Sequence, residues 1–288
     1  MKIITFYSEK GGVGKSSFTM LYASWLQDKY GVNVGVADFN YRIAGYRRSE
    51  IYNREKLRKA DPSIPSLDES KTWPIVQALF RDVEEYEKNG DNFPFASWLE
   101  DCIRYKSLKG KDVVLCDFPG SIREGQYMQC MMQRKLNLVV TPIDRDEQTV
   151  QSTVTLHNIN LKYKQNHCIF INRAQLSMKN MKGYFYKLAE RLISKDFPLL
   201  PDMVSNTDKM LAIDKVDIIR STFAYPDFSE NEAGDYGFEN LFIDITRELA
   251  RCPDIKGTPK ADLSFVDGLE KKDDGRQLHG TPYAKYEI

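Results

Sequence analysis

The sequence predicts an α/β fold in which a mostly parallel sheet carries helices on both faces, the doubly wound arrangement. Three observations indicate it. Short and nearly continuous apolar runs recur along the chain, as expected of strands that are buried on both faces. Amphipathic helical patterns separate most of these runs. A glycine-rich loop lies between the first apolar run and the first helical pattern.

The predicted strands are residues 3–7, 32–37, 113–116, 136–141 and 168–171. After the glycine-rich loop, apolar residues recur at the spacing i, i+3, i+4, i+7 and i+8, namely Phe18, Leu21, Tyr22, Trp25 and Leu26. This spacing is that of a helix with one face against a sheet. A strand, a loop and a helix in this order predict a fold of the P-loop NTPase type.

Between residues 45 and 110 the pattern changes to a variable, helical region. Residues 47–70 are charged and contain prolines, which predicts a surface segment with at most one short helix. Two amphipathic helices are expected to follow. Their apolar positions are Trp73, Val76, Leu79, Phe80 and Val83 for the first, and Phe95, Trp98, Leu99 and Cys102 for the second.

A last helix is expected around Leu241, Phe242, Ile245 and Leu249, and Pro253 ends it. Residues 1–252 are therefore predicted to form a single domain. Residues 253–288 contain few large aliphatic side chains, so a mobile tail or a partner-binding arm is expected there.

Composition limits the class of protein. A chain of 288 residues with 42% hydrophobic content can bury a large core. A formal net charge of zero means that DNA binding would need a local basic patch or a surface created on dimerisation. The five cysteines lack C-x-x-C spacing, and no apolar run approaches a membrane-spanning length. We expect a cytoplasmic protein without a membrane partner.

The glycine-rich loop has the residues of a phosphate-binding site. Glycines let successive backbone N–H groups point at the β- and γ-phosphates of a nucleotide, Lys15 adds a positive charge, and the Ser16 hydroxyl can bind Mg²⁺. The predicted nucleotide-binding residues are Gly11, Gly12, Val13, Gly14, Lys15, Ser16 and Ser17.

The loop departs from the common pattern G-x-x-x-x-G-K-[ST], because Glu9 occupies the first glycine position and Lys10 follows it. This K-G-G-x-G-K-[ST] variant resembles the deviant Walker A motif of the ParA/MinD ATPases, including the Soj-type partition proteins. The resemblance implies ATP and Mg²⁺ as ligands and a homodimer that closes around ATP. It also implies that Lys10 reaches the phosphates of the partner's nucleotide.

The same resemblance implies further site residues. Asp38 matches the first aspartate of the family's Asp-x-Asp pair, which is placed beside the metal and the signature lysine, but Asn40 replaces the second. An amide cannot accept a proton at neutral pH, so we expect slow or partner-dependent ATP hydrolysis. Asn40 could instead only cap a loop outside the site. Asp117 resembles the Walker B aspartate on the metal, and Gly120 resembles a switch residue near the γ-phosphate.

Two weaker similarities concern the adenine base and DNA. Asn172 and Arg173 end a strand that resembles the family's adenine-reading strand, and Pro201 lies in a segment that resembles the loop against the base. Each could equally be an ordinary turn residue. Basic residues of the C-terminal third are candidates for DNA contact, or else solvated charges: Lys209, Lys215, Arg220, Arg247 and Arg251.

The resemblance thus implies a ParA-like ATP switch that positions a plasmid, a chromosome or a conjugative element. Its expected partners are a second copy, DNA, and a ParB-like or adaptor protein. The tail lacks the basic amphipathic helix by which MinD-type proteins bind membranes. A metabolic synthetase on the same scaffold, with a substrate pocket built by residues 45–110, and a nearly non-hydrolytic ATP-bound scaffold protein remain alternatives.

Overall fold

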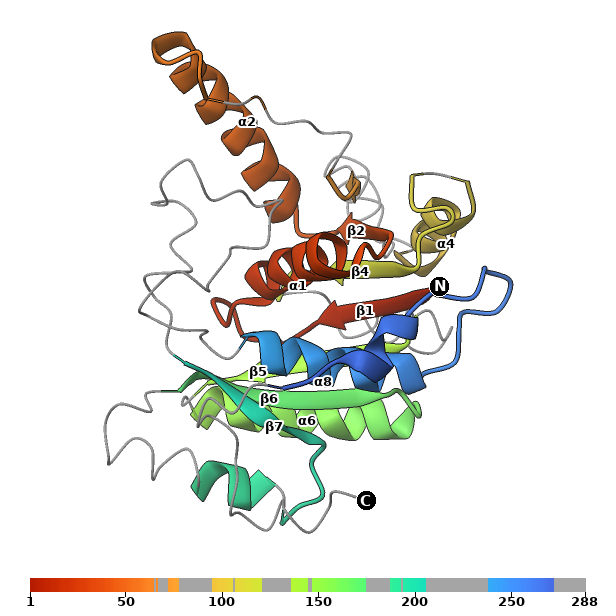
Figure 1. The fold of residues 1–288 in the computed structure, drawn as a ribbon. Coiled ribbons are helices and arrows are strands. Elements are labelled where there is room, and N and C mark those ends of the chain that lie inside the picture. Colours follow the sequence, from red (N-terminus) through yellow and green to blue (C-terminus); the bar gives the residue numbers. More distant parts are fainter. Residues whose placement is uncertain are drawn as a thin grey trace, which may run out of the picture.

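A parallel sheet of seven strands forms the centre of the protein in a computed structural model that describes residues 1–64, 66, 72–77, 95–105, 107–120, 136–144, 147–174, 187–192, 194–205 and 238–271 (Figure 1). The strand order is β3-β2-β4-β1-β5-β6-β7, and every neighbouring pair is parallel. The strands are β1 (Lys2–Phe6), β2 (Val34–Asp38), β3 (Ile75–Gln77), β4 (Val113–Asp117), β5 (Leu138–Ile143), β6 (His167–Ala174) and β7 (Leu199–Ser205). The predicted fold class is confirmed.

Helices cover both faces of the sheet because side chains of each strand alternate between the faces. On β1, Ile4 and Phe6 pack with α1 and α8, whereas Ile3 packs with α4 and α6. The helices of the described residues are α1 (Lys15–Tyr30), α2 (Arg42–Ala60), α4 (Phe95–Tyr105), α6 (Glu147–Lys162), α8 (Phe238–Arg251) and the 3₁₀ helix η3 (Ser264–Gly268). No helix of the described residues is long and apolar enough to cross a membrane.

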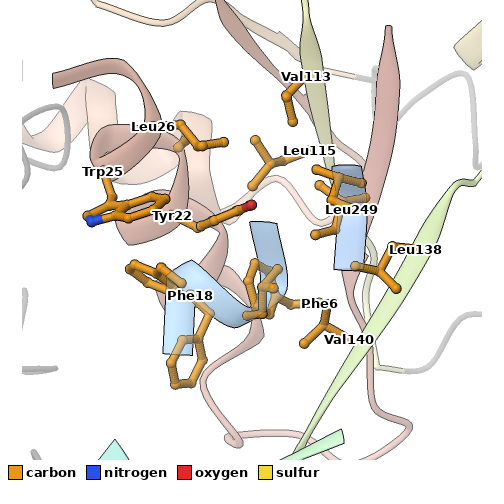
Figure 2. Packing of buried hydrophobic residues seen from close by; sticks show 14 of the residues in the cluster. Phe6, Phe18, Tyr22, Trp25, Leu26, Val113, Leu115, Leu138, Val140 and Leu249 are labelled. Carbon is orange, nitrogen blue, oxygen red and sulfur yellow. The ribbon is translucent and has the colours of Figure 1, made fainter. Parts of the chain in front are cut away.

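An aromatic cluster fixes α1 against the sheet (Figure 2). The Phe18 ring lies 5.7 Å from that of Phe6 and 4.9 Å from that of Phe170. One turn later the Tyr22 hydroxyl is buried and shares a 2.8 Å hydrogen bond with Thr246 of α8. These contacts hold the first turn of α1, and with it the end of the glycine-rich loop, at a defined place above β1.

Topology brings the predicted site residues to one edge of the sheet. β1 lies between β4 and β5, so the loop after β1 emerges at the middle of the sheet. Asp38 and Asp117 end neighbouring strands and face each other in the register of β2 and β4. Ligands of open α/β sheets bind at this carboxyl edge, near the point where the strand order reverses.

The segment after β2 differs from its prediction. The charged stretch from residue 47 predicts at most one short helix, but α2 is a 19-residue helix that begins at Arg42. The apolar spacing from Trp73 predicts a helix, but Ile75–Gln77 form the edge strand β3, which pairs with β2. Backbone pairing with an open strand edge outweighs the helical spacing there. Residues 78–94 lie outside the described part.

The first part of the segment predicted as a polar tail also differs from its prediction. Residues 253–271 lie against the domain: the N-terminal ammonium is 2.9 Å from Asp254 Oδ1, and Leu263, Val266 and Leu269 are buried against the α1 and α8 cluster. The Lys271 ammonium closes this segment by ion pairs with buried carboxylates of β7 and α8. The ordered domain therefore continues past residue 252, and residues 272–288 lie outside the described part.

Candidate nucleotide site

The glycine-rich loop needs glycine where the backbone turns. Gly12 and Gly14 have φ values of 76° and 93°, which side chains of L-residues disfavour. A Cβ on Gly14 would also lie 3.2 Å from the Phe18 ring. Gly14 is the N-cap of α1, and the helix has no acidic residue in its first turn. The free backbone N–H groups at this helix end are therefore available to an anion.

A cavity of about 220 Å³ lies over this helix end. It is lined by Gly11, Gly12, Gly14, Lys15, Ser16, Ser17, Asn40, Arg42, Tyr46, Gly120 and Arg173. Three of these residues are cationic, and among the described lining residues none is a carboxylate. Cations and helix-end N–H groups around one cavity suit a polyphosphate.

The two lysines of the loop have different surroundings. The Lys15 ammonium donates a 2.7 Å hydrogen bond to the Lys10 carbonyl. Burial lowers the pKa of Lys15 to about 8; the charge of Asp117 opposes this and that of Arg42 adds to it. A bound phosphate would favour the charged ammonium. The Lys10 ammonium instead lies 3.8 Å from Asp144 Oδ2, and Lys10 is not among the lining residues.

A second corner of the site joins oxygen atoms suited to a metal. The Ser16 hydroxyl donates to Asp117 Oδ2 at 2.8 Å, and the Asn40 amide nitrogen lies 3.3 Å from Ser16 Oγ and 3.4 Å from Asp117 Oδ2. Asp117 Oδ1 is buried without a hydrogen-bond partner in the described part of the chain. Burial raises the pKa of Asp117 to about 7. An unsatisfied carboxylate oxygen beside a hydroxyl fits a hard cation such as Mg²⁺.

Asp38 serves the backbone that leads into α2. Its Oδ1 accepts from the Asn40 N–H at 3.0 Å, and its Oδ2 accepts from the Ala44 N–H at 2.9 Å. Burial raises the pKa of the Asp38 carboxyl, and the backbone hydrogen bonds oppose that change. The Asp38 carboxylate thus holds the backbone at the start of α2, and within the described residues its side-chain hydrogen bonds go to neither Lys10 nor Ser16.

Two of the three residues predicted at the adenine base, Asn172 and Arg173, contact the glycine-rich loop. The Asn172 amide nitrogen donates to the Val13 carbonyl at 3.1 Å, and its oxygen accepts from the Arg173 N–H at 2.9 Å. Arg173 has a φ of 57° and donates to the Gly12 carbonyl at 2.7 Å. Asn172 is buried, so both of its polar atoms are already used inside the fold. Pro201 lies in β7 and does not line the cavity.

Only two of the DNA candidates lie in the described part. Arg247 donates to the Leu269 carbonyl at 2.8 Å, and Arg251 lies 2.5 Å from Glu248. Both have a partner in their own chain, although the Arg251 side chain is 73% exposed. Lys209, Lys215 and Arg220 lie outside the described residues.

Sequence reasoning missed three contributors to the site. Arg42 and Tyr46 line the cavity one turn apart on α2, and Asp144 pairs with Lys10 after β5. Arg42 follows Asn40 by two residues, so a helix placed there would have predicted that Arg42 lies near the site. Asp144 follows a strand in the parallel sheet, so its place at the carboxyl edge could have been inferred.

The fold and the site define a P-loop ATPase of the ParA/MinD class. A family model described as ATPase MipZ matches residues 2–156, more than half of the chain. The chain belongs to this family. We found no significant match among curated protein sequences.

Solved structures with the same fold are distant in sequence. The MinD cell division protein of Aquifex aeolicus superposes with a TM-score of 0.54 and 14% identity, covering 89% of this chain and all of that one. A putative plasmid partition protein of Borrelia burgdorferi B31 bound to AMPPNP superposes with a TM-score of 0.53 and 17% identity, covering 86% of this chain and 98% of that one. Cobyrinic acid a,c-diamide synthase of Mycobacterium smegmatis, with bound ADP and magnesium, superposes with a TM-score of 0.52 and 15% identity, covering 72% of this chain and 87% of that one. These similarities concern the fold.

Proposed function

We propose that this ATPase binds Mg-ATP, closes into an ATP-sandwich homodimer, and acts as a switch in the partition or positioning of a plasmid, chromosome or conjugative element. The observation that carries the proposal is the difference between the two loop lysines. Lys15 lines its own cavity, whereas the Lys10 ammonium lies away from it near Asp144. A lysine held outside its own cavity is suited to reach the nucleotide of a second copy.

In the nucleotide-bound site, Ser16 and Asp117 would hold Mg²⁺, which supplies charge neutralisation for the phosphates. Lys15 and the loop N–H groups would bind the β- and γ-phosphates, with Arg42 and Arg173 adding positive charge from either side. A role for Asn40 in the site is supported by its amide, which contacts both proposed metal ligands. It cannot take a proton from water, which favours slow hydrolysis that a ParB-like or adaptor protein stimulates.

Lys10→Ala tests the dimer switch. With Mg-ATP, the wild-type protein is expected to reach a dimer mass by light scattering and the variant to stay monomeric. Lys195→Ala, which removes an exposed cation far from the loop, is the matched control and is expected to dimerise. A dimer fraction for Lys10→Ala equal to that of the control would contradict the proposal.

Binding of non-specific duplex DNA separates the partition role from other uses of the switch. The measurement compares ATP, ADP and no nucleotide at one fixed low salt concentration, since electrostatic binding depends on salt. Binding that requires ATP supports the partition role. Dimerisation without DNA binding in any nucleotide state would point to a switch that carries a protein cargo.

A metabolic synthetase is the second candidate, and the shared fold of cobyrinic acid a,c-diamide synthase with ADP and magnesium is the observation that favours it. Such an enzyme activates a carboxylic acid with ATP. Stimulation of ATP turnover by a panel of carboxylic acids, without ATP-dependent dimerisation, would favour this candidate. Tight ATP binding without turnover under any condition would favour a scaffold protein.

A further inference from the structure

Helix α2 is anchored at its first turns and projects beyond them. Its base is held by the Asp38 carboxylate, by buried Ile43 and Ala44, and by Arg47, which donates to the Trp73 carbonyl at 2.8 Å and lies 4.7 Å from the Trp73 ring centre. The remainder of the helix extends away from the sheet (Figure 1). A long exposed helix with few contacts of its own is expected to gain stability from a partner.

One face of this projecting helix carries regularly spaced cations around an aromatic ring. Arg48, Tyr52, Lys56 and Lys59 follow at i, i+4, i+8 and i+11, which places them on one side of a helix. All four are exposed, and Tyr52 is 69% exposed. We call these four residues the α2 stripe.

The helix face that carries the stripe keeps a net positive charge, with three cations against one glutamate. The helix contains seven lysine and arginine residues and two glutamates. Of these glutamates, Glu50 pairs with Arg54 at 3.0 Å on another face of the helix. The exposed Glu55 lies on the same face as the stripe, three residues after Tyr52 and four before Lys59. In the part of the chain that the structure describes, Lys56 and Lys59 have no ion pair, and the side-chain partner of Arg48 is the neutral Gln77 at 3.3 Å. The stripe therefore presents positive charge to solvent.

We propose that the α2 stripe binds the phosphate backbone of duplex DNA. The stripe extends over about 17 Å at 1.5 Å per residue, which matches about five phosphates of one strand at 3.4 Å each. Lysine, arginine and tyrosine side chains are all common donors to backbone phosphates. Of the candidates in the C-terminal third, Arg247 and Arg251 have partners in their own chain, whereas Lys209, Lys215 and Arg220 lie outside the described residues.

The composition of the stripe favours a nucleic acid over an acidic protein. The buried centre of a protein interface is apolar and depleted in lysine, whereas the stripe has two lysines, an arginine and one ring. Backbone binding to DNA is electrostatic and needs no apolar centre. The proposal depends on neither the dimer nor hydrolysis, so its outcome is separate from that of the Lys10 experiment.

The test compares two triple variants with equal change of charge. The stripe variant is R48Q/K56Q/K59Q. The control variant is R191Q/K195Q/K256Q, which removes three exposed cations elsewhere. Binding of a labelled 24-base-pair duplex is measured by anisotropy across a salt series, with and without Mg-ATP, and binding of a fluorescent ATP analogue shows that each variant is folded.

The stripe variant is expected to bind DNA at least tenfold more weakly at low salt. Its slope of log K against log salt should be smaller by about 3, one for each lost phosphate contact, while the control keeps the wild-type slope. Equal losses in both variants, or none in the stripe variant, would overturn the proposal. Competition by polyglutamate as strong as by DNA would assign the stripe to an acidic protein, and loss of self-association would assign it to a second copy; either result overturns it.

Discussion

Substitution of Gly120 by alanine should weaken nucleotide binding through a purely steric effect. Gly120 follows β4 and lines the cavity, and its φ lies outside the left-handed region, so alanine can adopt its backbone conformation. Its Cβ, however, would lie 3.0 Å from the Glu9 carbonyl oxygen and 3.0 Å from Lys15 Nζ. The lysine end can move, but the Glu9 oxygen belongs to the backbone of the phosphate-binding loop, so the loop itself must shift.

Overpacking of this kind costs about 1–3 kcal/mol. If the strain falls on the nucleotide-bound loop, the dissociation constant rises roughly 5- to 150-fold at 1.4 kcal/mol per tenfold change. The assay is titration with a fluorescent ATP analogue and Mg²⁺. Gly268→Ala is the control, because a Cβ on Gly268 meets no atom within 4 Å and its φ is also unexceptional. Affinity of Gly120→Ala within twofold of this control would refute the steric reasoning.

Three further substitutions test the chemistry of the site and the packing of residues 253–271 against the rest of the domain. Asn40→Asp is expected to raise the single-turnover rate of ATP hydrolysis by roughly 10²-fold, because a carboxylate can orient and deprotonate water; an unchanged rate would count against this role. Burial raises the pKa of Asp117 to about 7, above its unfolded value, so this group makes the apo protein less stable as pH rises from about 4 to about 7. Asp117→Asn should remove that loss, so that its free energy of unfolding in urea at pH 8 exceeds that of the wild type by about 2–4 kcal/mol. Parallel curves of unfolding free energy against pH for the two proteins would contradict this. Lys271→Met should lower the unfolding free energy by about 3–5 kcal/mol, since two buried carboxylates lose their partner. The exposed control Lys260→Met should change it by under about 0.5 kcal/mol, and equal stability of the two variants would exclude the bridging role.

The phosphate-binding loop and the sheet could be predicted because their signals are local. A strand buried on both faces is apolar throughout, and the loop must have glycine where its φ is positive, as at Gly12 and Gly14. The place of Asp117 beside Ser16 followed from the apolar strand that precedes it. The amide of Asn40 lies beside Ser16 and Asp117, and its role in hydrolysis stays a prediction.

The placement of α2, β3 and Asn172 could not be predicted in the same way, because it depends on contacts between residues distant in the sequence. Helix α2 is mostly polar and has little apolar periodicity, and the Ala44 N–H in its first turn donates to the side chain of Asp38 from the preceding strand. The strand β3 is three residues long and exists through pairing with β2. The position of Asn172 at a strand end is compatible with contact to a base or to the loop, and only the packed structure shows its amide on the Val13 carbonyl.

The two oxygens of the Asp38 carboxylate connect the backbone of Asn40 to the base of α2. One oxygen of Asp38 holds the backbone of Asn40, whose amide lies beside Ser16 and Asp117, and the other holds the first turn of the helix at Ala44. At 1.5 Å per residue the 19-residue helix is about 28 Å long, so a tilt of about 10° at its base moves its far end by about 5 Å. Any movement of Asp38 would therefore be largest near Lys59, where a spin label would register it as a change of distance to the sheet.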